Sequence, residues 1–164
     1  MVAKKTMIVT GGGAGAALLL AIPFIGGWEG KSNDPYNDIV GVKTVCYGET
    51  RVQMKRYTDE ECLAILRSSV EKDFMEPVAK MTPTIANEPY QLAAATSLAY
   101  NIGIGAYQKS TVRKKFLVGD FVGACKSFQS WNKVRRLGKL VVSRGLDNRR
   151  KDEIKLCLTN LQTS

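Results

Sequence analysis

The sequence predicts an α+β fold, namely a mostly helical domain with one small β-hairpin near its N-terminus, preceded by an apolar helix. Three observations lead to this class. An uncharged stretch covers residues 7–27, β-branched and aromatic residues flank a glycine in residues 38–48, and apolar residues recur at helical spacing after residue 58. At 164 residues the chain is long enough to bury one substantial core.

The N-terminal stretch is about long enough to cross a hydrocarbon core, with Lys4 and Lys5 before it. It fits a cleaved signal peptide, a permanent anchor, or a temporary anchor that leaves the bilayer and packs onto the domain. No convincing small-x-small cleavage site follows it, and its many glycines disfavour a permanent anchor. From the residues alone the three possibilities stay open, but the composition changes after residue 27, which predicts a boundary between residues 1–27 and a domain at residues 28–164.

The next segment, residues 28–50, contains two carboxylates nine positions apart, Glu29 and Asp38, followed by Thr44. The residues around Gly41 predict a strand, a glycine turn and a second strand, which would hold Asp38 and Thr44 near each other. Hydrolysis of a glycosidic bond needs one protonated acid and one carboxylate on opposite sides of a sugar ring. The competing interpretation is a solvated turn, because turns favour aspartate for backbone reasons.

The remainder of the chain predicts helices. Thr58 and Glu61 form a capping box before a helix that buries an apolar face and ends near Pro77. A helix of small residues starts near Pro89 and ends at Gly103, which suggests a central element that other helices approach closely. Shorter helices are expected at residues 110–118, 120–131 and 147–161, joined by turns at Gly119, Gly138 and Gly145. The apolar face of the first helix consists of Leu63, Leu66, Val70 and Phe74.

Residue counts exclude several chemistries. The chain has no histidine, which rules out histidine-based triads and histidine metal sites, and its four cysteines lack the CxxC spacing of structural zinc. No cofactor or metal is expected. Export to an oxidising compartment would permit disulfides. Of the three possible connectivities we favour Cys46–Cys62 and Cys125–Cys157, since both pairs are near in sequence and lie on elements expected to be neighbours.

The net charge of +9 suggests an anionic partner: nucleic acid, membrane headgroups or an acidic wall polymer. Eight basic residues fall between Lys133 and Lys151. A solvated face is the simplest explanation of this run, and attraction to an anionic wall or membrane is the main alternative. No nucleic-acid motif accompanies it and aromatic residues are sparse there, so no nucleic-acid partner is expected.

The segment WEG…PYNDIVGVKTVCYGET, with its Glu-x8-Asp-x5-Thr spacing, resembles the phage-type lysozymes of glycoside hydrolase family 24, and within them the signal-anchor-release endolysins. Residues 100–103 and 131–157 are similar to the end of the central helix and to the C-terminal helices of that family. The resemblance implies a lysozyme-like fold. It also implies hydrolysis of the β-1,4 bond between N-acetylmuramic acid and N-acetylglucosamine in peptidoglycan, with inversion.

The resemblance also implies roles for individual residues. Glu29 would be the general acid, Asp38 and Thr44 would hold and activate the attacking water, and Arg149 would pair with Glu29. Weaker candidates for contacting the saccharide are Gly48, Tyr100 and Ser110. Position 49 is glutamate, where related chains often carry histidine.

The resemblance further implies a monomer held inactive in the host inner membrane through residues 7–27, with a cytoplasmic N-terminus, and released to the periplasm on loss of the membrane potential. Residues 1–27 contain no cysteine, so activation by refolding is favoured over disulfide exchange. Two other functions remain alternatives. A membrane-disrupting, holin-like protein would act through its apolar N-terminus and basic C-terminal region, and a nucleic-acid-binding module would need no export.

Overall fold

The computed structural model describes residues 12–161, and the part of the predicted anchor before residue 12 lies outside this range. The main helices are α1 (Gly12–Trp28), α2 (Asp59–Ser69), α4 (Pro89–Ile102) and α8 (Arg144–Leu158). Two antiparallel hairpins accompany them, β1 (Ser32–Asn37) with β2 (Lys43–Cys46), and β3 (Lys133–Arg136) with β4 (Lys139–Val142). None of the helices in residues 12–161 is both long and apolar enough to cross a membrane.

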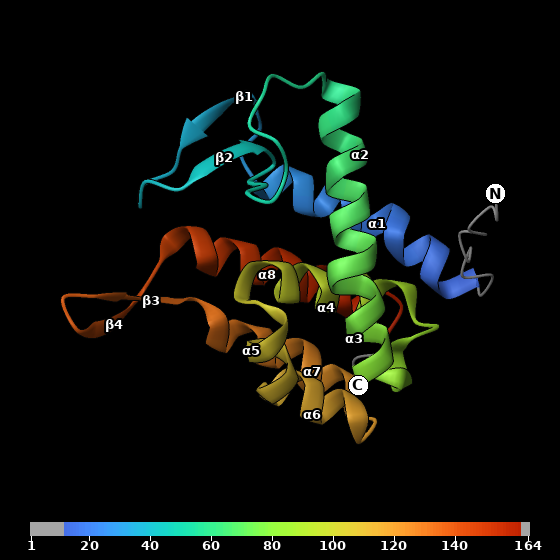
Figure 1. Ribbon diagram of the computed structural model, residues 1–164. Coiled ribbons are helices and arrows are strands. Elements are labelled where there is room, and N and C mark those ends of the chain that lie inside the picture. Colours follow the sequence, from blue (N-terminus) through green and yellow to red (C-terminus); the bar gives the residue numbers. More distant parts are fainter. Residues whose placement is uncertain (1–11, 162–164) are drawn as a thin grey trace.

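The α4 helix forms the centre of the molecule, with α1 and α8 packed against it (Figure 1). Every residue from Gln91 to Ala99 is buried, and several of these residues are alanines, so neighbouring helices can approach the α4 backbone closely. This confirms the prediction of a central helix of small residues. The β1–β2 hairpin and the first turns of α2 lie together at one end of the molecule (Figure 1).

The α1 helix contributes one face to the same core as α4. Its buried residues are Ala17, Leu18, Ala21 and Ile25. A Cβ atom added at Gly13 would lie 2.5 Å from the carbonyl oxygen of Asn87, so only glycine fits there without a backbone shift. The described part of the predicted anchor is therefore an integral core element in this conformation.

The predicted end of the first domain helix near Pro77 is wrong. The capping box of Thr58 and Glu61 starts α2 as expected, but the helix continues through a π-helical segment, η1 (Val70–Met75), into α3 (Glu76–Met81). Pro77 lies at the first turn of α3, directly after the widened π turn, where its missing N–H is tolerated. Leu63, predicted to be buried, is about half exposed, whereas Leu66 and Val70 are in the core.

The β1–β2 hairpin confirms the predicted strand–turn–strand unit, but its first strand lies earlier than expected. Tyr36 pairs with Thr44 and Asn37 pairs with Lys43, which leaves Asp38 in the connecting turn rather than on a strand. Asp38 occupies the turn because its side chain accepts hydrogen bonds from backbone N–H groups within that turn.

Residues 133–142 correct the expectation of helices joined by a simple turn at Gly138, because they form the β3–β4 hairpin. The three C-terminal helices themselves are shorter or shifted relative to the prediction: α6 (Thr111–Leu117), α7 (Phe121–Ser127) and α8, which begins three residues before Asp147. A 3-10 turn, η3 (Phe128–Trp131), follows α7, while α5 (Ile104–Lys109) and a second 3-10 turn, η2 (Pro83–Ile85), flank α4.

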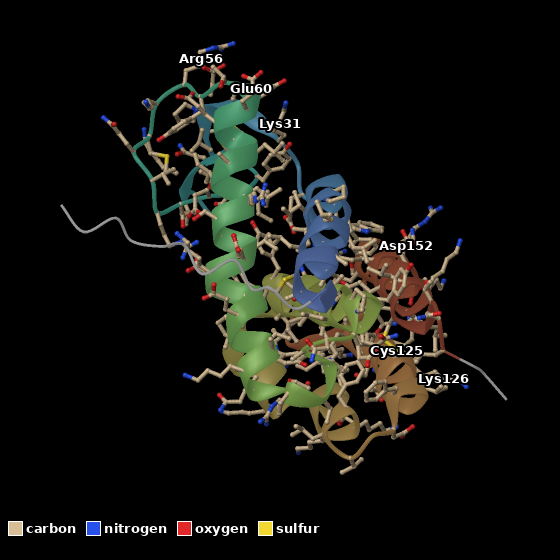
Figure 2. The ribbon with its side chains drawn as sticks, turned by 90° about the vertical axis from the view of Figure 1, so that its right-hand side faces the viewer. Lys31, Arg56, Glu60, Cys125, Lys126 and Asp152 are labelled. Atoms are coloured by element: carbon tan, nitrogen blue, oxygen red, sulfur yellow. A yellow bond between two sulfur atoms is a disulfide. The ribbon has the colours of Figure 1, made fainter. Side chains whose placement is uncertain are left out.

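Both favoured disulfides are present, which confirms the predicted connectivity. Cys46–Cys62 ties β2 to α2, and Cys125–Cys157 ties α7 to α8. Cys125 lies on the helical side of the molecule, far from Lys31, Arg56 and Glu60 at the end formed by β1 and the start of α2 (Figure 2). The two bonds therefore stabilise different regions of the domain.

Candidate active site

Glu29 follows directly after the last residue of α1. Its backbone N–H donates to the carbonyl of Ile25 at 3.0 Å, which continues the helical hydrogen bonding by one residue. Its side chain is 25% exposed, and its Oε1 accepts a hydrogen bond from the Arg149 guanidinium at 2.8 Å. The core packing of α1 and the position of α8 thus jointly determine where this carboxylate lies.

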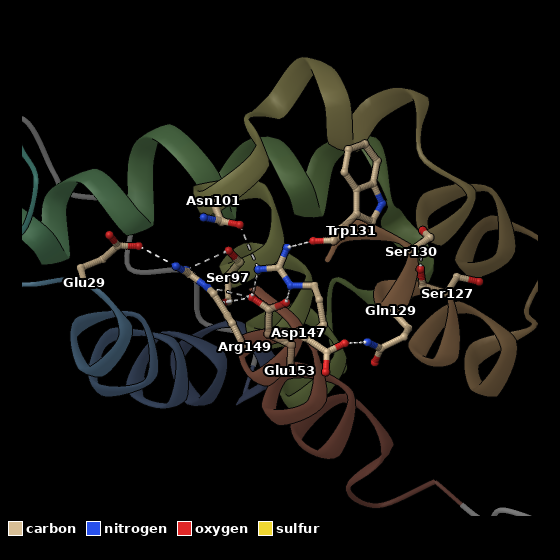
Figure 3. A network of polar contacts seen from close by, with 11 residues as sticks. Glu29, Ser97, Asn101, Ser127, Gln129, Ser130, Trp131, Asp147, Arg149 and Glu153 are labelled. Atoms are coloured by element: carbon tan, nitrogen blue, oxygen red, sulfur yellow. Dashed lines mark hydrogen bonds and ion pairs between the residues drawn. The ribbon is translucent and has the colours of Figure 1, made fainter. Parts of the chain in front are cut away.

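Arg149 belongs to a buried network of charges between α4 and α8 (Figure 3). Its Nε donates to Glu153 Oε1 at 3.3 Å, and its own side chain is only 5% exposed. Glu153 is fully buried and also accepts a hydrogen bond from the Ser97 hydroxyl at 2.6 Å. Because the Arg149 guanidinium contacts both carboxylates, the orientation of Glu29 depends on residues that are almost completely buried.

Arg150 completes the network from the other side of Glu153. Its NH2 donates to Glu153 Oε1 at 3.1 Å and to the amide oxygen of Asn101 at 3.0 Å. Its Nε lies 2.7 Å from Glu153 Oε2, an ion pair outside hydrogen-bonding geometry. Burial raises the pKa of Glu153 and lowers that of Arg150, while the attraction between the two groups opposes both shifts. The positive charges of Arg149 and Arg150 thus balance the negative charges of Glu153 and Glu29.

Asp38 and Thr44 are brought together through a single residue, Val42. The backbone N–H of Val42 donates to Asp38 Oδ1 at 2.9 Å, and its carbonyl accepts from the Thr44 hydroxyl at 2.9 Å. Val40 N–H donates to the same Asp38 oxygen, also at 2.9 Å. Thr44 is buried, whereas Asp38 is partly exposed. Both backbone hydrogen bonds go to Oδ1 of Asp38, and its Oδ2 takes part in neither of them.

The weaker candidates occupy different surroundings. Gly48 is exposed just after β2 with φ +83°, a conformation that glycine adopts readily. Tyr100 on α4 donates to the Tyr47 carbonyl at 3.3 Å. Burial, followed by the nearby charge of Glu29, raises the pKa of Tyr100 to about 12. The Tyr100 hydroxyl thus joins α4 to the chain just after β2.

Ser110, in contrast, belongs to the junction of α5 and α6. Its hydroxyl donates to the Tyr107 carbonyl at 2.7 Å and accepts from the Arg113 N–H at 3.1 Å, which caps α6. Both hydrogen-bonding functions of this side chain serve the local fold.

Sequence reasoning missed Glu153, Ser97 and Arg150, which carry most of the buried network. One signal could have found part of it: Arg149 and Arg150 precede Glu153 by four and three positions, the spacing at which helical side chains meet.

Sequence reasoning also missed the hydrogen bonds that hold the Glu49 carboxylate. Burial alone would raise the pKa of Glu49, but hydrogen bonds from the side chain and backbone of Arg51 lower it overall. Within residues 12–161 no cluster of side chains could hold a metal ion.

The chain is similar to known proteins over most of its length. The family model for phage lysozyme matches residues 26–153, a range that contains Glu29, Asp38, Thr44, Arg149 and Glu153. The SAR-endolysin of Enterobacteria phage P21 is 36% identical over 160 residues, covering 92% of each chain. The active form of the P1 phage endolysin Lyz is similar in structure, with a TM-score of 0.74 and 26% identity over 88% of this chain and 86% of that one.

The secreted inactive form of the same P1 endolysin is less similar, with a TM-score of 0.50 and 25% identity over 71% of this chain and 80% of that one. The family model and the SAR-endolysin relative each match most of the chain, and this extent of similarity shows the family. The chain belongs to the phage lysozyme family.

Proposed function

We propose that this protein is a phage endolysin that hydrolyses the β-1,4 bond between N-acetylmuramic acid and N-acetylglucosamine in peptidoglycan. The observation that carries the proposal is the pairing of half-buried Glu29 with Arg149, one short strand before a turn that holds a second carboxylate, Asp38. Two carboxylates held by separate parts of the fold can serve as acid and as water-activating base. Peptidoglycan is the expected partner, and the enzyme is expected to act as a monomer.

In the proposed reaction, protonated Glu29 donates its proton to the glycosidic oxygen, and the bond from that oxygen to the anomeric carbon breaks. Asp38 and Thr44 hold a water whose oxygen attacks the anomeric carbon from the opposite face, while Asp38 accepts the proton it releases. This gives inversion at the anomeric carbon. Arg149 positions Glu29 and does not contact the reacting atoms.

The matched experiment compares wild-type protein with Glu29→Gln and a control, Glu60→Gln, at an exposed site at the start of α2. Loss of the proton donor should lower the rate of turbidity loss of outer-membrane-permeabilised Gram-negative cells by about 1,000-fold. The variant should remain folded, because the amide oxygen can still accept from Arg149, which also keeps its ion pair with Glu153. The control should clear the suspension as wild type does. Equal clearing by Glu29→Gln would instead support a membrane-disrupting protein. Polarimetry or NMR of the first product would test inversion.

We further propose that residues 1–27 hold the protein inactive in the inner membrane before release, with the catalytic domain at residues 28–164. Two findings support this: relatives over most of the chain are SAR-endolysins, and α1 is apolar yet packs in the core of a conformation more similar to an active endolysin than to an inactive one. In the membrane, Glu29 would be two residues beyond the apolar run, so the contact with Arg149 could not form.

Leu19 allows this proposal to be tested without disturbing the folded domain. It lies on α1 but is 73% exposed, so Leu19→Lys should leave the melting temperature and the activity of purified protein unchanged. A lysine at the centre of a membrane segment costs about 3 kcal/mol on insertion scales. Leu19→Lys should therefore move the protein from the membrane fraction of energised cells to the soluble fraction, whereas Leu19→Ala should not. Unchanged membrane association of Leu19→Lys would contradict the anchor.

A further inference from the structure

The β3–β4 hairpin carries apolar side chains that no other part of the described chain covers. It projects away from the helical body on the left of Figure 1. Leu137 at its tip is fully exposed, and Leu140 and Val142 on β4 are also exposed. An exposed aliphatic residue is common by itself, but several on one projecting element indicate a contact surface.

Leu137 is also an unfavourable residue for the turn in which it lies. Its φ is +48° and that of Gly138 is +77°, so both central residues of this two-residue turn have positive φ. Such turns favour Asn-Gly or Asp-Gly, because a leucine side chain is sterically disfavoured in the left-handed region. Leu137 thus neither fills the core nor suits the local backbone. Its side chain serves no contact within residues 12–161.

Basic residues alternate with these apolar side chains. Lys133, Arg135, Arg136 and Lys139 are all exposed, and none forms an ion pair with a carboxylate in the described part of the chain. In the strand register Lys133 lies opposite Val142 and Arg135 lies opposite Leu140 on one face, while Arg136 and Lys139 pair on the other face next to the turn. Both faces near the tip therefore present cations beside aliphatic groups. The hairpin contains neither an acidic nor an aromatic residue.

We propose that the β3–β4 hairpin docks the released protein onto an anionic phospholipid surface. Leu137 would enter the boundary between headgroups and acyl chains, and the four cations would lie at the phosphate level. Lipid fits this surface better than glycan. Sugar recognition relies on hydrogen bonds and aromatic stacking, whereas exposed aliphatic side chains gain free energy by entering the hydrocarbon of a membrane. This surface function involves no bond cleavage and is independent of the proposed glycosidase reaction.

The hairpin is also held firmly at its base. The Ser143 N–H donates to the Asn132 carbonyl at 2.8 Å, the Asn132 side chain donates to Asp147 at 2.9 Å, and Arg150 reaches the Trp131 carbonyl at 3.4 Å. A docking contact at the tip would therefore orient the whole helical body relative to the membrane, including α8, which carries Arg149.

The test measures co-sedimentation of the full chain with phosphatidylcholine vesicles, with and without phosphatidylglycerol. All proteins carry Leu19→Lys, which keeps α1 from inserting. Leu137→Asn should lower the partition coefficient to anionic vesicles about tenfold, by removing one buried leucine from the interface. Because Asn-Gly suits the turn, its melting temperature should equal or exceed that of the parent. Changing Arg136 and Lys139 together to glutamine should weaken binding to anionic vesicles about tenfold, and less to zwitterionic ones.

Val118→Asn provides the matched control. Val118 is 80% exposed, precedes Gly119 as Leu137 precedes Gly138, and lies near Lys114 and Lys115 on α6. It should bind vesicles like the parent. Parent-like binding by Leu137→Asn, or an equal loss in Val118→Asn, would overturn the proposal. So would a loss of binding by Leu137→Asn to isolated peptidoglycan sacculi with vesicle binding intact, since the hairpin would then contact the wall.

Discussion

Glu29 and Asp38 are held in opposite ways. The Glu29 carboxylate depends on Arg149, a side chain 120 residues away in sequence, and on the buried charges behind it. The Asp38 carboxylate is held by backbone N–H groups two and four residues further along the same turn. The position of Glu29 is therefore a property of the whole core, whereas that of Asp38 is a property of one hairpin. Damage to the first support should destabilise the whole protein, and damage to the second should mainly lower activity, with a smaller loss of stability.

The largest effect is expected from Glu153→Ala. Removing this fully buried carboxylate leaves the Arg149 and Arg150 guanidinium groups without their shared partner. Leaving a buried charge unpaired costs about 3–5 kcal/mol, which urea unfolding should report as a lower free energy of unfolding. Asp152→Ala, the adjacent exposed residue on α8, should change it by less than about 0.5 kcal/mol. Equal stabilities would mean that the network does not support the core.

A pair of variants at Asp38 tests the local support. Asp38→Asn keeps an oxygen that can accept from Val40 and Val42 but removes the charge, while Asp38→Ala removes both. Both should lower the rate of peptidoglycan cleavage about 100-fold. Only the alanine variant should also lose about 1–2 kcal/mol of stability, because the turn loses its acceptor. Comparable melting temperatures for the two variants would show that Asp38 does not hold the turn.

Glu49 combines both kinds of support and should give the smallest effect. Backbone N–H groups of Thr50 and Arg51, together with the Arg51 side chain, lower its pKa in the folded protein. A carboxylate with a lowered folded pKa adds stability above its usual value of 4.5, and that stability is lost as the pH falls below this value. Glu49→Gln should therefore be less stable at neutral pH and lose less on acidification.

Urea unfolding over a series of pH values measures this slope for Glu49→Gln, with Glu60→Gln as the exposed comparison. The Glu60→Gln profile should follow that of wild type. A wild-type slope in Glu49→Gln would instead assign the acid sensitivity to other carboxylates, such as Asp59 and Asp147, whose pKa values are also lowered by hydrogen-bonding neighbours, Lys31 and Lys151 first among them.

Features that depend on local sequence were predictable. The capping box at Thr58, the proline start of α4 and the glycine turn after Asp38 each follow from the preferences of a few adjacent residues. The disulfide pairing followed from the short sequence separation of each pair. The roles proposed for Glu29, Asp38 and Thr44 rest on spacing and family resemblance, and they stay predictions until the variants are measured.

Features that depend on tertiary context were not predictable. The β3–β4 hairpin has an exposed apolar residue where hairpin turns usually carry asparagine, so its turn signal was weak. The continuation of the α2 helix past Pro77 depends on a π-helical turn that has no marker in the sequence. Glu153 has the composition of a surface residue, and only the approach of α4 with Ser97 encloses it.

Gly13 illustrates how one position can serve two environments. Where α1 meets the turn before α4, the backbone of Asn87 occupies the place that a Cβ of residue 13 would need. In a bilayer the same missing side chain would contribute little transfer energy, and so would make the segment easier to extract. If α1 spans the membrane as proposed, the absence of a side chain at residue 13 makes insertion of α1 into lipid less favourable. The same absence allows α1 to pack against the backbone of Asn87 in the folded domain. Selection at this position would then act on the free-energy difference between the membrane-spanning state and the packed state, rather than on the stability of either state alone.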